Sequence, residues 1–458
     1  MNTFPFVRDI PIEDGYDLLV AGGGPAGSAA AICAARLGAK VLLVEALGCL
    51  GGTGTSGLVT AFDPMADGEK MLVGGLMREI VETLQARGGL GPQVTPDFYR
   101  RRFHCWTPYQ AEALKVLLDE LVTAAGVEVR FFTRAIDADV SGAGAAGQRL
   151  NGVVINNIEG HRFIRARAYI DATGNAELAT LCGAPCREAG RDTPRIMPPT
   201  LCSVWSGVDW ARATSRPDGT GPDHQQRLYE EALDAGEIFS HHDRHLPGAF
   251  RVGSGMAMVN AGHVFNLDAL RCRSLSDGMM AGRRLALEYL QFYRRCVPGF
   301  EHVEHVTTAS LMGIRESRRI VGEYELTYAD YLARRQFPDQ IAVFNKAVDI
   351  HVYDDSEAEY ERYYREFNEH GRLKPGECFG LPYGILVPKG WENLWVAGRC
   401  NSSDVQVHGS IRVQPAAAMM GQAAGTAAVQ SVRTGQTACG LDTGALVETL
   451  RAAGAYLP

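Results

Sequence analysis

The first sixty residues hold the clearest succession of apolar segments in the chain. Residues 16–21 form an apolar run, which is typical of a parallel strand buried on both faces. A segment of small and apolar side chains follows from Ser28 to Leu37 and stops at Gly38, as expected of a helix that packs on that strand. Residues 40–44 repeat the strand pattern and end on Glu45. The pattern predicts a strand–helix–strand unit within a parallel sheet.

Glycines with the spacing GxGxxG lie in the turn between the first strand and the helix. Gly22 permits the tight turn, Gly24 lets backbone N–H groups reach a pyrophosphate, and Gly27 lets the helix pack closely on the strand. Glu45 lies about 20 residues on, where a carboxylate accepts hydrogen bonds from a ribose diol and disfavours a 2′-phosphate. We therefore predict a dinucleotide site that includes Gly22, Gly24, Pro25, Ala26, Gly27 and Glu45.

A second glycine-rich stretch, EALGCLGGTGTSGLV, begins at Glu45 and favours FAD over NAD. It suits a long dinucleotide whose pyrophosphate and flavin ring continue past the first turn. The stretch resembles the loop that follows the ribose-binding acid in the fumarate reductase and glutathione reductase superfamilies of FAD proteins. The resemblance implies cofactor contacts at Ala46, Cys49, Gly51, Gly52 and Thr53.

Later segments resemble the same superfamily. AAGVEVRFFTRAIDADV is similar to the strand that passes the adenine, ARAYIDATGNAELA carries an Asp-Ala-Thr-Gly signature, and ENLWVAGRCNSSD is similar to the segment that contacts the ribityl chain. The superfamily often places Asp or Glu after the glycine of that last segment, where this chain has Arg399, so we expect Asp404 to supply the carboxylate. The cofactor contacts implied by these segments are Arg134, Ala135, Ala172, Thr173, Gly174, Gly398, Arg399 and Asp404.

Together with MGIRESRRIVGEYELT and LPYGILVPKG, these motifs resemble the FAD-dependent oxidoreductase family over about residues 15–430. The resemblance implies an α/β fold with a Rossmann-like FAD-binding domain, built from a parallel sheet, helices and a β-meander, and an inserted α+β substrate or cap domain. We expect FAD-binding parts at residues 15–186 and 376–435, the cap domain at 187–375, and a helical tail at 436–458.

A proline begins a helix of small side chains in HGSIRVQPAAAMMGQAAG. Pro415 suits the first helical position because its missing N–H costs nothing there. We expect the start of this helix, with Val413, Gln414 and Ala416, to face the pyrimidine edge of the flavin. The helix dipole would there stabilise negative charge on the reduced ring and raise its reduction potential. A GxxxG helix whose only role is close packing is the alternative.

The candidate catalytic side chains are His408, Arg412, Arg315 and His351. His408 and Arg412 flank the expected flavin edge, and a buried structural hydrogen bond is the alternative role. The guanidinium of Arg315 can hold a substrate carboxylate or enolate with two parallel hydrogen bonds, although an internal salt-bridge cluster is at least equally compatible. His351 and His263 have the chemistry of a general acid or base.

Histidines and cysteines give weaker signals. The segment HHDRH, from His241 to His245, is rich in metal-binding side chains, but its polar surroundings favour a solvated loop, and we predict no metal site. Position 54 is glycine, so Cys49 lacks the partner that a glutathione-reductase-type disulfide needs. We expect noncovalent FAD, with a thioether at Cys49 as the alternative. The 11 cysteines include no CxxC pair, which indicates reduced thiols.

Composition narrows the class of partner. The 458 residues are 46% hydrophobic and 21% charged, and 53 acidic against 45 basic residues give a net charge of −8. Without a long basic run, nucleic acid and anionic membranes are poor partners. No apolar run reaches the roughly 18 residues of a membrane span, and the first residues lack a signal-peptide core. We expect a cytoplasmic protein.

The leading functional hypothesis is an FAD-dependent oxidoreductase of the dehydrogenase or oxidase type. It would exchange hydride at flavin N5 with a small organic metabolite while a general base handles the proton. O2 or a separate electron carrier would reoxidise the flavin, and a homo-oligomer is left open. An FAD-dependent monooxygenase or hydroxylase is the second hypothesis. The third, from another class, is a non-enzymatic FAD-binding protein.

Overall fold

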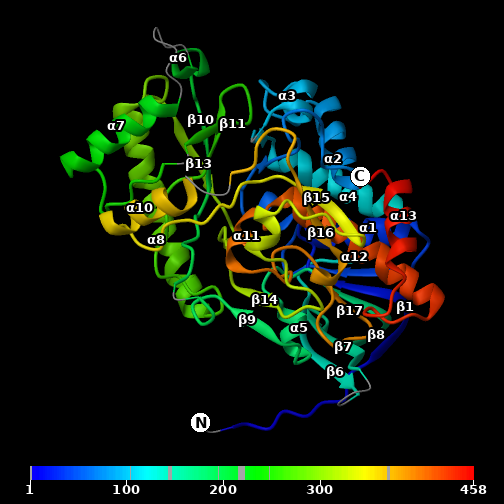
Figure 1. Ribbon diagram of the computed structural model, residues 1–458. Coiled ribbons are helices and arrows are strands. Elements are labelled where there is room, and N and C mark those ends of the chain that lie inside the picture. Colours follow the sequence, from blue (N-terminus) through cyan, green and yellow to red (C-terminus); the bar gives the residue numbers. More distant parts are fainter. Residues whose placement is uncertain are drawn as a thin grey trace.

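The protein has two parts, each built on its own sheet (Figure 1). The computed structural model describes residues 3–103, 105–142, 147–193, 195–214, 222–246, 248–368 and 372–458. One part is a mixed sheet flanked by helices, and the other is a smaller antiparallel sheet with its own helices. The α/β fold class predicted from the sequence is confirmed, whereas the exact domain boundaries stay predictions.

The main sheet combines parallel strands with an antiparallel meander. In spatial order its strands are β5 (Glu128–Arg130), β2 (Val41–Val44), β1 (Ile12–Ala21), β8 (Gly160–Asp171), β7 (Arg149–Asn157) and β6 (Arg134–Ser141), with β17 (Leu394–Val396) beside the end of β8. Strands β5, β2, β1, β8 and β17 run parallel, and β6, β7 and β8 form the meander. β8 belongs to both because its first residues pair with β7 and its last pair with β17.

The last four residues of strand β1, Leu18 to Ala21, are apolar on both faces because both faces of the sheet are covered there. Successive side chains of a strand point to opposite sides. Leu18 and Val20 pack among the helices, while Leu19 and Ala21 pack toward the meander. The near-continuous apolar run in the sequence is thus the signature of a central parallel strand.

Two helices far apart in sequence lie side by side on one face of the sheet. They are α1 (Pro25–Arg36) and α12 (Gln414–Thr434). A Cβ atom at Gly421 would lie 2.0 Å from the carbonyl oxygen of Ala26, and one at Gly425 would lie 2.3 Å from that of Ala30. The two glycines thus let α12 lie directly against the backbone of α1. The same side also holds α2 (Gly75–Ala86), α4 (Ala111–Ala125) and α13 (Thr443–Ala452).

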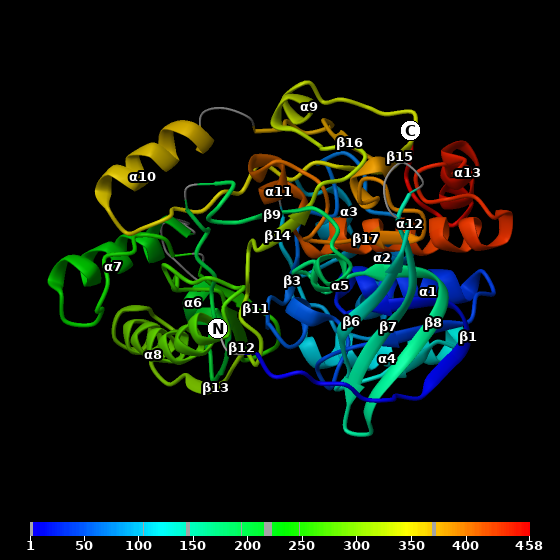
Figure 2. The ribbon, with the colours of Figure 1, turned by 90° about the horizontal axis from the view of Figure 1, so that it is seen from below.

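The second part, which we call the cap, has an aromatic core. Trp205, Tyr229, Phe292 and Tyr293 are buried together in it. Its antiparallel strands, in spatial order, are β11 (Ala249–Arg251), β12 (Met256–Val259), β10 (Ser203–Ser206) and β13 (Glu304–Thr308). Its helices are α6 (Trp210–Thr214), α7 (Pro222–Ala235) and α8 (Cys272–Cys296), with α10 (Glu357–Tyr363) nearby in both ribbon views (Figures 1 and 2).

The remaining elements are short, and several of them, such as α9 and β16, lie on the main part (Figure 2). The helical ones are η1 (Gly52–Gly54), α3 (Pro96–Arg101), α5 (Glu177–Leu181), α9 (Tyr328–Leu332), η3 (Tyr364–Asn368), η4 (Tyr383–Leu386) and α11 (Val405–Ile411). The strands are β3 (Ala61–Phe62), β4 (Thr107–Pro108), β9 (Cys186–Glu188), β14 (Arg318–Ile320), β15 (Gln340–Phe344) and β16 (Phe379–Pro382). The sequence did not predict α11, which carries His408.

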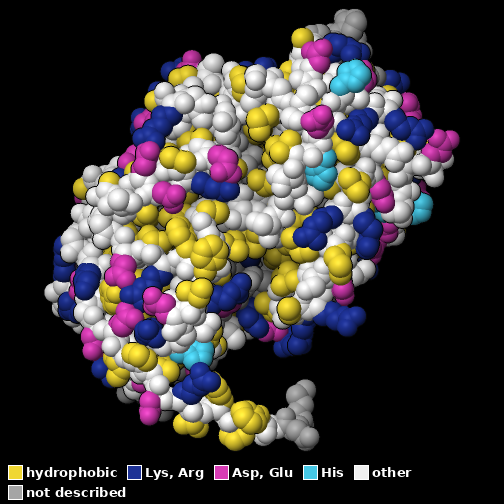
Figure 3. Space-filling view, turned by 180° about the vertical axis from the view of Figure 1, so that it is seen from behind, with side chains coloured by type: hydrophobic (Ala, Val, Ile, Leu, Met, Phe, Trp, Pro, Cys, Tyr) yellow, Lys and Arg dark blue, Asp and Glu magenta, His cyan; other side chains and the backbone are white. Residues whose placement is uncertain are grey.

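The surface mixes acidic and basic side chains on the face opposite to that of Figure 1, with hydrophobic side chains gathered near its middle (Figure 3). Among the helices of the described residues, none is long and apolar enough to cross a membrane.

Candidate functional site

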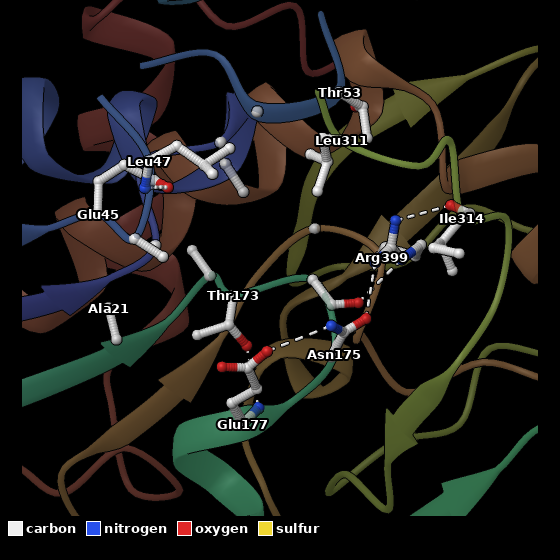
Figure 4. Close-up of a pocket in the computed structure, with 18 of the residues that line it drawn as sticks. Ala21, Glu45, Leu47, Thr53, Thr173, Asn175, Glu177, Leu311, Ile314 and Arg399 are labelled. Atoms are coloured by element: carbon white, nitrogen blue, oxygen red, sulfur yellow. Dashed lines mark hydrogen bonds between the residues drawn. The ribbon is translucent and has the colours of Figure 1, made fainter. Parts of the chain in front are cut away.

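A cavity of about 410 Å³ lies at the carboxyl ends of the parallel strands. Residues that directly follow four of these strands line it: Gly22 after β1, Glu45 after β2, Ala172 after β8 and Ala397 after β17. Ligands of open α/β sheets bind in this position, outside the carboxyl ends of the strands. In Figure 4, Glu45 and Leu47 lie at one end of the cavity and Arg399 and Ile314 at the other.

The glycines of the first turn differ in what surrounds them. Gly22 has a φ of +93°, and a Cβ there would lie 2.6 Å from the carbonyl oxygen of Ala172. A Cβ at Gly27 would lie 1.7 Å from the carbonyl oxygen of Gly22. Both positions therefore need glycine for the fold itself. A Cβ at Gly24 would meet no protein atom within 4 Å, although Gly24 lines the cavity at the start of α1.

The start of α1 and its open space fit a pyrophosphate. Free backbone N–H groups and the positive end of the helix dipole favour an anion at a helix N-terminus. Gly24, Pro25 and Ala26 line the cavity there, together with Gly52 and Thr53 from the second glycine-rich stretch.

Glu45 is held by backbone groups at the first end of the cavity. The N–H of Gly23 donates to its Oε2 (2.6 Å), and the N–H of Leu47 donates to its Oε1 (2.8 Å). Burial raises the pKa of Glu45, and the same backbone hydrogen bonds oppose that rise. A carboxylate offers about four acceptor sites, so lone pairs remain for the hydroxyls of a ribose.

Arg399 brings a partly buried positive charge to the other end. Its guanidinium donates to the carbonyl oxygens of Gly174 (2.9 Å) and Ile314 (2.7 Å) and to Oδ1 of Asn175 (2.9 Å). Within the described part of the chain no carboxylate lies within ion-pair distance of it, and burial lowers its pKa. An unbalanced cation in a cavity wall favours an anionic ligand group.

Arg412 lines the same end and leads into a buried network of charges. Its Nη2 donates to the carbonyl oxygen of Asp349 (3.1 Å) and lies 3.4 Å from Oδ2 of that residue. Nζ of Lys346 lies 2.5 Å from Oδ2 of Asp63 and 3.7 Å from Oδ2 of Asp349. Burial alone would raise the pKa of Asp349, but Lys346, His351 and Arg412 hold it well below its usual range. The site is thus a cationic pocket with a fixed carboxylate behind it.

Comparison with known proteins decides the class of this site. A sequence model described as FAD dependent oxidoreductase matches residues 17–451, which is most of the chain. This protein belongs to the FAD dependent oxidoreductase family. FAD is therefore its cofactor, and the glycine turn, Glu45 and the long cavity fit that dinucleotide. Membership of the fumarate reductase and glutathione reductase superfamily stays a prediction.

Other similarities of this FAD dependent oxidoreductase are local or distant. Dihydrolipoyl dehydrogenase of Trypanosoma brucei brucei is 56% identical over 48 residues, which span 10% of this chain and 10% of that enzyme. A geranylgeranyl bacteriochlorophyll reductase-like protein of Thermoplasma acidophilum is 15% identical with a TM-score of 0.43, covering 96% of this chain and 83% of its own. Flavin-dependent brominase Bmp2 is 13% identical with a TM-score of 0.45 at the same coverages. None of these bears on the reaction.

Most residues that the sequence assigned to FAD line the cavity of this oxidoreductase. They are Gly22, Gly24, Pro25, Ala26, Glu45, Ala46, Gly52, Thr53, Arg134, Ala135, Ala172, Thr173, Gly174, Gly398, Arg399 and Gln414. Gln414 and Ala417 bring the start of α12 to the cavity wall, as expected for the helix dipole. The side chain of Gln414 is itself occupied, because it accepts from the hydroxyl of Tyr109 (2.8 Å) and donates to the carbonyl oxygen of Val59 (2.6 Å).

Other predicted site residues lie away from the cavity wall. They are Gly27, Cys49, Gly51, Asp404, Val413, Ala416, Arg315, His351 and His408. Asp404 needs correction, because its carboxylate caps helix α11 by accepting from the N–H of Val407 (2.8 Å) and also accepts from that of Tyr328 (2.5 Å). We expected Asp404 to supply the carboxylate that the superfamily places where this chain has Arg399. Asp404 does not line the cavity, so it does not take that role in the cavity wall.

His408 also needs correction. It is fully buried, and its Nε2 lies 2.8 Å from the carbonyl oxygen of Arg399. Burial, followed by Arg319 and Arg412, holds the pKa of His408 well below its usual value. A neutral ring behind Arg399 positions that residue, so the structure favours the structural alternative for His408.

Arg315 and His351 lie behind the wall. The guanidinium of Arg315 donates to the carbonyl oxygen of Pro198 and to Oγ1 of Thr200 (3.2 Å). Burial, followed by Arg412, lowers the pKa of Arg315 to about 10. His351 reaches the network through Asp349, whose Oδ1 lies 3.4 Å from its Nε2.

Several residues that line the cavity were not predicted from the sequence. The cap supplies an apolar side of the cavity, with Leu275 and Met279 on α8 and a segment that precedes β14. The apolar positions of an amphipathic helix do not indicate which of them contacts a ligand.

The charge network behind the wall could have been noticed in the sequence. Lys346 and Asp349 are charged residues in the mainly apolar stretch NKAVDIHVY. The residues that the sequence missed are Ala21, Val44, Leu47, Thr133, Asn175, Glu177, Ala269, Leu275, Met279, Ser310, Leu311, Met312, Ile314, Ala397 and Ala417.

The placement of Cys49 gives a test of how FAD is held. Its Sγ lies 3.1 Å from Oγ of Ser56, and the residue does not line the cavity. We expect acid precipitation of the purified protein to release all of the yellow colour, measured as flavin absorbance in the supernatant. Colour that stays in the pellet of the parent but not of Cys49→Ala would show a thioether instead.

Proposed function

We propose that this oxidoreductase is a dehydrogenase or oxidase acting on a small organic metabolite that carries a carboxylate or several oxygen atoms. The observation that supports the substrate class is the pair of partly buried guanidinium groups, Arg399 and Arg412, at one end of the FAD cavity. Both residues line the cavity, so their guanidinium groups can contact a ligand that occupies it.

The chain contributes binding and charge rather than the redox step itself. FAD supplies a two-electron acceptor when it is bound. Arg412 would orient a carboxylate or carbonyl oxygen, since a guanidinium matches such groups geometrically. The network of Asp349 and Lys346 fixes Arg412 from behind. The cap residues Leu275 and Met279 would exclude water from the reacting end.

Anaerobic reduction by a metabolite panel tests the proposal. Carboxylates and polyhydroxylated metabolites are mixed singly with the oxidised enzyme, and loss of flavin absorbance is followed by stopped flow. Rapid bleaching by a member of these classes supports the proposal. Bleaching only by uncharged apolar compounds would replace the proposed substrate class. In a separate assay under labelled O2, incorporation of the label into the product would indicate a monooxygenase instead. Absence of bleaching by any compound would favour a non-enzymatic FAD protein.

The proposal also covers the electron acceptor, the oligomeric state and the cellular location of the protein. Either O2 or a separate electron carrier reoxidises the flavin, and the ratio of turnover in air to turnover with an artificial carrier distinguishes them. Nucleic acid and membranes are not expected as partners, a homo-oligomer remains to be tested by light scattering, and we place the protein in the cytoplasm.

A further inference from the structure

Three histidines from distant parts of the chain converge beside the FAD cavity. His245 lies between α7 and β11, His263 follows β12, and His351 follows β15. Nε2 of His263 lies 2.9 Å from Nδ1 of His351. One ring nitrogen from each of the three residues lies within 4.8 Å of those of the other two.

The arrangement of the rings matches that of imidazoles around a single ion. Metal–nitrogen bonds of about 2.1 Å in a tetrahedral arrangement place the centres of the rings about 5 Å apart. The observed distances between ring centres are 5.1 Å for His245 and His263, 5.3 Å for His245 and His351, and 5.0 Å for His263 and His351. The three rings therefore need little movement to bind one metal ion together.

Carboxylates stand behind two of the rings. Oδ2 of Asp243 lies 3.1 Å from Nδ1 of His263, and Oδ1 of Asp349 lies 3.4 Å from Nε2 of His351. Metal-binding histidines nearly always direct their outer N–H toward such an acceptor, which fixes the tautomer. The 2.9 Å between the two inner nitrogens is the length of a hydrogen bond, in which one of them carries the proton. A metal ion bound between them would take the place of that proton.

We propose that His245, His263 and His351 bind one divalent transition-metal ion of the imidazole-preferring kind, such as zinc or iron, with a fourth position open to water or substrate. Three histidines with an open position are the ligand pattern of catalytic zinc sites. The sequence predicted no metal, because the polar surroundings of the HHDRH segment favoured a solvated loop. Of the three ligands only His245 belongs to that segment, and the other two lie far away in the chain. Asp349 joins this site to Arg412 in the cavity wall. Metal binding does not depend on the proposed oxidation.

Binding of Zn²⁺ to the FAD-loaded full chain tests the proposal directly. The protein is treated with a chelator, dialysed against micromolar free Zn²⁺, and its zinc is measured by elemental analysis. We expect one ion per chain and a higher Tm, because an ion that binds only the folded state stabilises it. His245→Ala should weaken binding on the order of a hundredfold and lose the rise in Tm. His242→Ala, an exposed neighbour in the same loop, is the matched control and should bind as the parent does.

Further variants keep the test decisive if His245→Ala does not fold. His245→Gln keeps the size of the side chain and should show the same loss, and Asp243→Asn should weaken Zn²⁺ about 10- to 100-fold. The proposal is overturned if the parent binds less than a tenth of an equivalent. It is also overturned if the His245 variants retain one zinc per chain, because the histidines would then be a hydrogen-bonded cluster only.

Discussion

Gly24→Val is expected to yield folded protein that purifies without yellow colour. Gly24 has φ −66° and ψ −172°, which any L residue adopts, and a Cβ there would meet no protein atom within 4 Å. The valine side chain would occupy the space at the start of α1 where the pyrophosphate belongs. We expect the affinity for FAD to fall by about 10²-fold or more, which corresponds to roughly 3 kcal/mol.

The measurement is the ratio of flavin to protein together with circular dichroism. Gly255→Val is the matched control, because a Cβ at this glycine of the cap also has room, with its nearest neighbour at 3.8 Å. The control should keep its FAD. Gly24→Val with full FAD occupancy would place the pyrophosphate elsewhere, and an unfolded Gly24→Val with a folded control would show that this glycine serves the fold.

Arg412→Ala is expected to keep its FAD but to lose about 10²-fold or more of its reductive turnover. Removal of one donor that stabilises developing charge in an active site has an effect of this size. The midpoint potential of the bound flavin should also fall, because a cation near the ring favours the negatively charged reduced form. Turnover is measured with the substrate found in the anaerobic panel, and the potential by equilibration with a reference dye.

Conservative variants separate charge from shape at this position. Arg412→Lys keeps the positive charge, so its flavin should have a midpoint potential close to that of the parent. Arg412→Gln keeps hydrogen bonding without the charge, so its midpoint potential should fall as in Arg412→Ala. Arg273→Ala, whose side chain is 93% exposed on α8, is the control for a general loss of positive charge. If Arg412→Ala turns over at the rate of the parent with an unchanged potential, Arg412 is structural.

The part of the site that could be predicted from sequence is the part in which neighbours in sequence are neighbours in space. The turn from β1 to α1 and the acid after β2 are fixed by backbone geometry and short-range hydrogen bonds, so Gly22, Gly24 and Glu45 were found from spacing alone. The apolar run at the end of β1 was equally readable, because both faces of the sheet are covered there.

The part that could not be predicted depends on long-range packing. His408 was assigned to the flavin edge because α11 was not recognised, and the turn of that helix directs the ring to the backbone of Arg399. His263 and His351 are 88 positions apart, and only the fold brings them together. Charge in an apolar stretch, as at Lys346 and Asp349, is the one signal that could have exposed the network.

The contact between α1 and α12 has a consequence for how the chain is made. Several hundred residues separate α1 from the alanines and glycines of residues 414–434 that cover it, so α1 leaves the ribosome long before α12 does. Until then the nascent chain carries an apolar helix without its partner, which is the kind of surface that chaperones bind. The cofactor can enter a complete site only after α12 has emerged. A ribosome stalled ahead of α12 would hold a chain that has its glycine turn but no stable flavin.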